Sequence, residues 1–127
     1  MEIVKNALNW FEIPVKDFER AKAFYSKIFD FEMPTAPMGN TMMGFLLYDQ
    51  EGGGVGGAIV HGEGAVPSQQ GTMVYLNGGS DLTVVLNRVE KADGKVVVPK
   101  TKISDEHGFF AVFVDTEGNK VGLHSMK

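Results

Sequence analysis

The chain has 127 residues, of which 43% are hydrophobic and 22% are charged, and its formal net charge at pH 7 is −4. This length and composition are typical of a single globular domain and exclude a largely disordered chain. The 12 basic residues form no cluster, so no nucleic-acid partner is expected. The absence of cysteine excludes disulfides, thiolate metal centres and a cysteine nucleophile.

The N-terminal segment MEIVKNALNWFEIPV mixes acidic and apolar residues and lacks the apolar core of a signal peptide. Apolar runs elsewhere are far shorter than the roughly 20 residues that cross a bilayer as a helix. The sequence therefore predicts a cytoplasmic protein with no membrane partner.

In the first half of the chain, a short apolar strand at residues 13–15 leads into Asp17, a good helix N-cap. A strand over residues 44–48 later precedes the octapeptide DQEGGGVG at residues 49–56, whose glycines indicate a hairpin. Between them, apolar residues at helical spacing predict a helix that ends near Asp30: Ala21, Phe24, Tyr25 and Ile28.

The second half begins after residues 62–71, GEGAVPSQQG, whose composition is that of a linker. Ser80 or Asp81 then caps a second predicted helix, which is expected to stop at Gly94. An apolar strand over residues 110–114 precedes a second octapeptide, DTEGNKVG. The apolar positions of the second helix also follow helical spacing: Leu82, Val85, Leu86 and Val89.

The two octapeptides begin at Asp49 and Asp115 and share five identical residues. The same order of elements surrounds both, with Pro34 and Pro99 at similar places. Such a repeat indicates an internal duplication in which each half has the order βαβββ. The prediction is one domain, 1–127, made of module one (7–61), a linker (62–71) and module two (72–126).

Two stretches carry a family resemblance: FEIPVKDFERAKAFYSKIFDFEMP (residues 11–34) and DTEGNKVGLHS (residues 115–125). They resemble the vicinal oxygen chelate superfamily, which includes glyoxalase I, bleomycin-resistance proteins and extradiol dioxygenases. Small glyoxalase-related proteins of unassigned reaction look most similar. The resemblance implies an α+β fold in which two βαβββ modules form a cupped mixed β-sheet, and it implies a homodimer. In metal-dependent members, a divalent metal chelates two neighbouring substrate oxygens.

The family pattern has a metal ligand on the first strand of each module and a glutamate on the last. The resemblance places these four positions at Trp10, near Val74, at Gly56 and at Gly122. An indole N–H only donates, and glycine has no side chain to offer. No metal site and no cofactor are therefore expected, with a weakly bound divalent metal as the alternative.

Two polar residues lie close to these positions, because Glu12 shares a strand face with Trp10 and His124 shares one with Gly122. Glu12 either points into a pocket or faces solvent. His124 is either a general base or substrate hydrogen-bonder, or a partly exposed histidine at a strand end. As an acid–base pair, Glu12 and His124 are the candidate catalytic residues.

Aromatic residues are the expected walls of a ligand cup, with Trp10 and Phe11 on either side of the ligand and Glu12 giving polarity. Tyr48 and Tyr75 either line the cup or pack within their own strands. The candidate ligand-binding residues are Trp10, Glu12, Tyr48, Tyr75 and His124.

Two functions follow from this pattern. The first is a metal-free protein that binds a small molecule in its β-cup, in the manner of the bleomycin-resistance proteins. The alternative is a lyase or isomerase that acts on a carbonyl compound by Glu12 and His124 acid–base chemistry, with or without a weakly held metal. Whether the protein is an enzyme stays open at this point.

Overall fold

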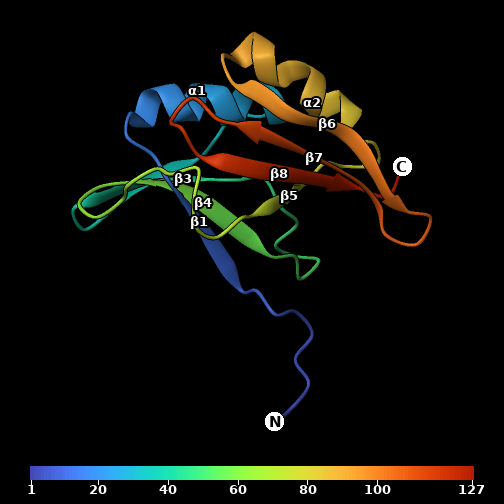
Figure 1. Ribbon diagram of the computed structural model, residues 1–127. Coiled ribbons are helices and arrows are strands. Elements are labelled where there is room, and N and C mark those ends of the chain that lie inside the picture. The colour runs from blue at the N-terminus through green and yellow to red at the C-terminus, as the bar shows by residue number, and fades with distance from the viewer.

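The computed structural model describes residues 1–127, the whole chain, and has eight strands and two α-helices (Figure 1). Both helices lie on one side of the strands. None of the helices is long and apolar enough to span a membrane. The first half comprises β1 (Trp10–Pro14), α1 (Phe18–Phe29), β2 (Thr35–Met38), β3 (Thr41–Phe45) and β4 (Gly56–His61). The second half comprises β5 (Tyr75–Asn77), α2 (Thr83–Val89), a 3-10 turn (Glu90–Ala92), β6 (Lys95–Ser104), β7 (Gly108–Val114) and β8 (Lys120–Ser125).

The strands form two four-stranded sheets of identical topology, β1-β4-β3-β2 and β5-β8-β7-β6. In each sheet the first and last strands of the half pair in parallel, and the other pairs are antiparallel. Trp10 is opposite Gly56 in one sheet, and Tyr75 is opposite Gly122 in the other. This confirms the α+β fold with two βαβββ modules that form a cupped sheet. We call β1–β4 with α1 the first module, and β5–β8 with α2 the second.

The predicted helices are present, and their ends have the expected chemistry. The Asp17 carboxylate accepts from the backbone N–H of Arg20, 3.1 Å away, and α1 ends at Asp30, which has a left-handed backbone. In the second module Asp81, not Ser80, accepts from the N–H of Thr83 at 2.9 Å. This helix differs from the prediction because α2 is seven residues long and its last turn tightens to 3-10 before Gly94.

The two hairpins differ more than their octapeptides suggest. The strand predicted over residues 44–48 ends at Phe45, so a long loop of residues 46–55 connects β3 to β4. The equivalent connection in the second module is only residues 115–119. Positive φ also falls on Gly53 in one copy and Gly118 in the other, which are not equivalent in the repeat. The extra glycines of the first copy allow this wider loop.

One hydrophobic core serves both modules. The Phe24 ring of α1 packs against Phe113 of β7, with ring centroids 5.7 Å apart. The guanidinium of Arg88 on α2 donates to the carbonyl of Ile28 on α1 at 3.1 Å. Strand alternation sends Ile13 and Leu76 into this core. The neighbours of these residues therefore lie on the opposite face, which the helices do not cover.

Candidate functional site

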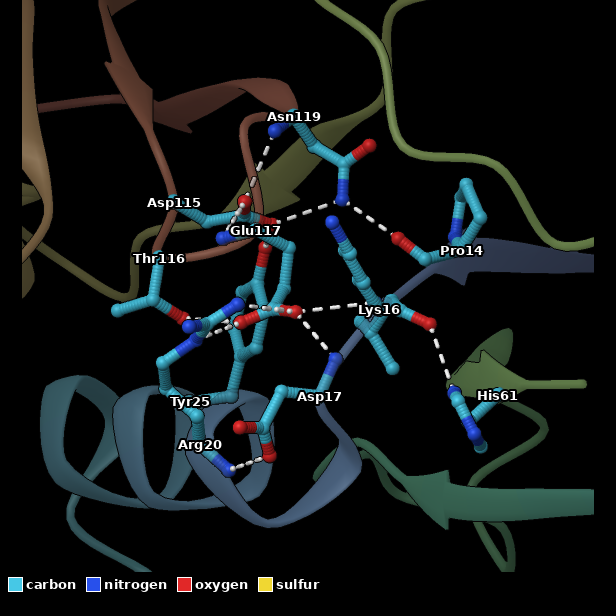
Figure 2. A network of polar contacts seen from close by, with 11 residues as sticks. Pro14, Lys16, Asp17, Arg20, Tyr25, His61, Asp115, Thr116, Glu117 and Asn119 are labelled. Atoms are coloured by element: carbon cyan, nitrogen blue, oxygen red, sulfur yellow. Dashed lines mark hydrogen bonds and ion pairs between the residues drawn. The ribbon is translucent and has the colours of Figure 1, made fainter.

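A network of polar contacts joins the hairpin between β7 and β8 to the start of α1 (Figure 2). We call this network the module joint; it consists of Pro14, Lys16, Asp17, Arg20, Tyr25, Asp115, Thr116, Glu117 and Asn119. These residues come from opposite ends of the sequence. The joint therefore fixes how the two modules sit together at this end of their interface.

Glu117 is the centre of the joint, and its side chain is completely buried. Its Oε1 accepts from the backbone N–H groups of Lys16 at 2.9 Å and of Asp17 at 2.6 Å. Its Oε2 pairs with the guanidinium Nε of Arg20 at 2.7 Å. One carboxylate thus satisfies two backbone donors and one cation that belong to the other module.

Asp115 supports the same hairpin from within. Its carboxylate accepts from the Tyr25 hydroxyl at 2.7 Å and from the backbone N–H groups of Glu117 and Asn119. The amide nitrogen of Asn119 donates to the Pro14 carbonyl at 2.7 Å, which ties β1 to the hairpin. Burial, followed by the charge and hydrogen bond of Asp115, raises the pKa of Tyr25 well above its usual value, so its hydroxyl stays a donor.

The pKa of Glu117 is lowered from 4.5 to about 2. Burial by itself raises this pKa, but hydrogen bonds outweigh it, above all those from the Arg20 side chain and the Asp17 N–H. The folded state therefore prefers the ionised carboxylate. Its stabilisation is present above about pH 4.5 and is lost as the pH falls toward about 2.

We expect Glu117→Gln to reduce the free energy of unfolding more at pH 6 than at pH 3. The wild-type carboxylate has lost part of its advantage at the lower pH, whereas glutamine does not titrate. Urea denaturation of both proteins at the two pH values measures this difference. An equal loss at both would contradict the lowered pKa of Glu117.

The repeat also predicts a second joint, between the hairpin after β3 and the start of α2, and in the structure this second joint does not form. The helices align 64 residues apart, so that Asp17 corresponds to Asp81 and Arg20 to Val84. The hairpins align 66 residues apart, so that Glu117 corresponds to Glu51. Glu51 is exposed and makes no hydrogen bond, and Val84 is 55% exposed. This counterpart of the module joint is not closed: Val84 stands where the first helix has Arg20, and Glu51 makes no ion pair.

A mostly apolar cavity of about 660 Å³ lies at this open end. It is bounded by β1, the loop 46–55, β5 and the start of α2. Ligand pockets in proteins are typically cavities of 300–1,000 Å³ with mainly apolar walls. The apolar lining comes from both modules: Leu8, Phe11, Phe29, Leu46, Leu47, Val55, Val74, Tyr75, Leu76, Val84 and Val85.

A second, more polar cavity of about 510 Å³ adjoins the first. It is also lined by His124 and Ser125 at the end of β8 and by Met126 and Lys127 after it. The residues that line both cavities belong to β5 and the turn after it: Tyr75, Leu76, Asn77, Gly79 and Ser80. The two cavities therefore share part of their lining at this short strand and its turn.

The structure does not bring the predicted pair Trp10 and Phe11 to one cavity. Consecutive strand residues point to opposite faces, so Phe11 lines the apolar cavity while Trp10 lies on the helix-free face against Phe45. Glu12 is exposed on that face and accepts from the indole N–H of Trp10 at 3.3 Å. Neither Trp10 nor Glu12 lines either cavity.

Of the two tyrosines, only Tyr75 lines a cavity. Both rings cover a glycine of the last strand of their module. A Cβ added at Gly122 would lie 2.3 Å from the Tyr75 ring, and one added at Gly56 would lie 2.4 Å from the Tyr48 ring. Tyr48 therefore packs locally, as one of the two interpretations held, whereas Tyr75 both packs and lines the cavities.

The residues present do not fit the metal of the resembled family. The register pairs Tyr75 with Gly122 as it pairs Trp10 with Gly56, so the first-strand position of the second module is Tyr75 and not Val74. Indole and glycine supply no ligand, and aromatic rings cover both glycines. No group of three or more His, Asp or Glu side chains is arranged so that it could hold a metal ion.

His124 and Glu12 are not in contact. Glu12 lies on β1 and His124 on β8, in different sheets, and no hydrogen bond or ion pair connects them. His124 lines the polar cavity, and its Nε2 lies 2.6 Å from the carbonyl oxygen of His107. The structure thus places His124 at a cavity and Glu12 at the surface.

The sequence profile of the Glyoxalase/Bleomycin resistance protein/Dioxygenase superfamily matches residues 7–123. The chain belongs to this superfamily. Within the glyoxalase superfamily, solved structures of the same fold include a glyoxylase/bleomycin resistance protein/dioxygenase domain from Frankia sp. EAN1pec. That structure has a TM-score of 0.71 at 14% identity, over 98% of this chain and 100% of that one.

Two further solved structures are similar along almost the whole chain. Hypothetical protein SA1046 from S. aureus has a TM-score of 0.65 at 19% identity, covering 98% of this chain and 95% of that one. TnmS3, an antibiotic binding protein from Streptomyces sp. CB03234, has a TM-score of 0.63 at 22% identity, covering 98% of both. Comparison with curated protein sequences finds no relative. These identities show a shared fold only.

Proposed function

We propose that this glyoxalase-superfamily protein binds a small molecule without a metal, and that the apolar part of the ligand occupies the cavity at the open end of the module interface. The observation that carries the proposal is the cavity itself, about 660 Å³ in volume and lined mainly by apolar side chains from both modules. Transfer of apolar ligand surface from water into such a site is favourable by about 25 cal/mol per Å².

The closed and open joints support this location. At one end of the module interface, Glu117 and Arg20 form an ion pair that closes the joint. At the other end, the position equivalent to Arg20 is Val84, and the cavity is open there. The printed description of TnmS3 as an antibiotic binding protein is in keeping with a binding function for this fold. The four family metal positions, which hold tryptophan, tyrosine and two glycines, support a metal-free site.

A neutral aromatic probe, methyl 2-naphthoate, tests the proposal. We expect micromolar binding by isothermal titration calorimetry, with backbone amide shifts concentrated at the cavity lining. Val84→Trp places a bulky ring at the cavity mouth and should weaken binding at least about tenfold, the size of effect that the loss of a buried apolar contact produces.

Val97→Trp is the matched control, because Val97 is also an exposed valine but lines neither cavity. It should leave probe affinity unchanged. No binding by the wild-type protein, or equal affinity in both variants, would overturn the proposed site.

The structure does not favour the alternative function as a lyase or isomerase that uses Glu12 and His124. A general acid–base pair acts on one substrate, and Glu12 lies outside the cavity that His124 lines. We therefore retain His124 and Tyr75 as proposed ligand contacts. By likeness to the superfamily, we also propose a cytoplasmic homodimer.

A further inference from the structure

The polar cavity places one hydrogen-bond donor and one acceptor on neighbouring strands. Asn77 on β5 and His124 on β8 are directly paired in the parallel ladder, and both line this cavity. Neighbouring strands lie about 4.8 Å apart, and paired residues point to the same face. The two side chains are therefore side by side.

The bond to His107 fixes the acceptor. A carbonyl oxygen only accepts, so the Nε2 of His124, 2.6 Å from the His107 oxygen, carries the hydrogen. In a neutral imidazole the other nitrogen, Nδ1, then has a lone pair. Nδ1 has no hydrogen-bond partner within the chain.

The turn after β5 fixes the donor in the same way. The side-chain oxygen of Asn77 accepts from the backbone N–H of Gly79 at 2.9 Å. This bond orients the amide, because a backbone N–H requires the oxygen and not the nitrogen. The NH₂ group of Asn77 is left with two hydrogens and no partner within the chain.

A carboxamide or lactam edge complements this pair, since its carbonyl oxygen accepts from Asn77 while its N–H donates to His124. The apolar cavity adjoins this polar one, because Tyr75 and Asn77 line both cavities. We propose that the two cavities bind one amphipathic ligand, whose apolar body fills the first cavity and whose carboxamide or lactam group is held by Asn77 and His124 in the second. This inference rests on the proposed binding function and names the polar group of its ligand.

Three naphthalene probes of similar size test whether the polar group contributes to affinity or whether binding is due to the apolar ring alone. 2-Naphthamide offers both an acceptor and a donor, whereas methyl 2-naphthoate and 2-naphthoate offer no donor. We expect the amide to bind about tenfold more tightly than either, because the others leave a cavity nitrogen unpaired. Equal affinity for amide and ester would overturn the assignment and leave the apolar site standing. Failure of all three to bind would overturn the proposed function as well.

Two variants test the residues. Asn77→Asp keeps an acceptor for the Gly79 N–H but removes the donor, and His124→Phe removes the acceptor. His124→Phe should reduce the preference for amide over ester to within about twofold, because only the amide has an N–H that donates to this acceptor. Asn77→Asp should weaken both probes about tenfold, because the carbonyl oxygens of amide and ester both accept from the Asn77 NH₂ group. An unchanged preference in His124→Phe, or unchanged affinity of both probes in Asn77→Asp, would overturn the proposal. So would tighter binding of 2-naphthoate, which would point to the ammonium of Lys127 at the same cavity.

The tautomer of His124 gives a readout that needs no ligand. Long-range ¹⁵N NMR of the free protein at pH 8 should show that Nε2 of His124 carries a hydrogen and that Nδ1 carries none. The opposite tautomer would remove the acceptor from the cavity and contradict the proposal.

Discussion

Glu117→Ala is expected to lower the free energy of unfolding by about 2 kcal/mol, the size of effect that the loss of hydrogen bonds to a charged group produces. The substitution removes the carboxylate that accepts from the Lys16 and Asp17 N–H groups and joins the two modules. It also leaves Arg20 without its partner. Urea denaturation of the wild-type protein and the variant at pH 7 measures this loss of free energy.

The repeat supplies a matched control in Glu51→Ala. Glu51 occupies the equivalent place in the first octapeptide but is exposed and makes no hydrogen bond. Its replacement should change stability by less than about 0.5 kcal/mol, as is usual for surface sites. Similar losses for the two alanine variants would show that the module joint is not what stabilises this arrangement.

Val84→Arg is expected to reduce the affinity for methyl 2-naphthoate at least about tenfold. The arginine restores the residue that the first helix has at the equivalent position, and Glu51 lies on the hairpin that would supply its partner. Closure of the open joint then covers the cavity mouth. Calorimetric titration measures the affinity.

Val84→Gln distinguishes the effect of an ion pair from that of side-chain size, because glutamine is long but uncharged. We expect its affinity to stay within about threefold of wild type. Adding Glu51→Gln to Val84→Arg should return most of the lost affinity if the ion pair closes the mouth. A double variant as weak as Val84→Arg alone would contradict closure by pairing.

The fold was predictable because its signals are local and occur twice. Asp17 caps the first helix, the apolar spacing of each helix matches its buried face, and the octapeptides mark both hairpins. Duplication then limits the topology, since two copies of one order of elements must form similar modules. The repeated register, Trp10 with Gly56 and Tyr75 with Gly122, confirms that reasoning.

The site was harder to predict because it depends on where the two copies differ. Arg20 and Val84 occupy equivalent helix positions, but only the placement of the opposite hairpin shows that one residue seals an interface and the other borders a cavity. The interpretation that placed a ligand between Trp10 and Phe11 overlooked strand alternation, which puts these two side chains on opposite faces of β1. The fixed tautomer of His124 depends on a carbonyl 17 residues away, which no local pattern reveals.

The unequal ends of the module interface have a consequence for how this protein can evolve. The polar contacts that join the modules gather around Glu117, while Val84 borders the apolar cavity. Substitutions in the lining of the cavity therefore leave the polar contacts of the module joint in place. An interface between two copies of one module can in this way keep one end constant while the residues at the other end vary.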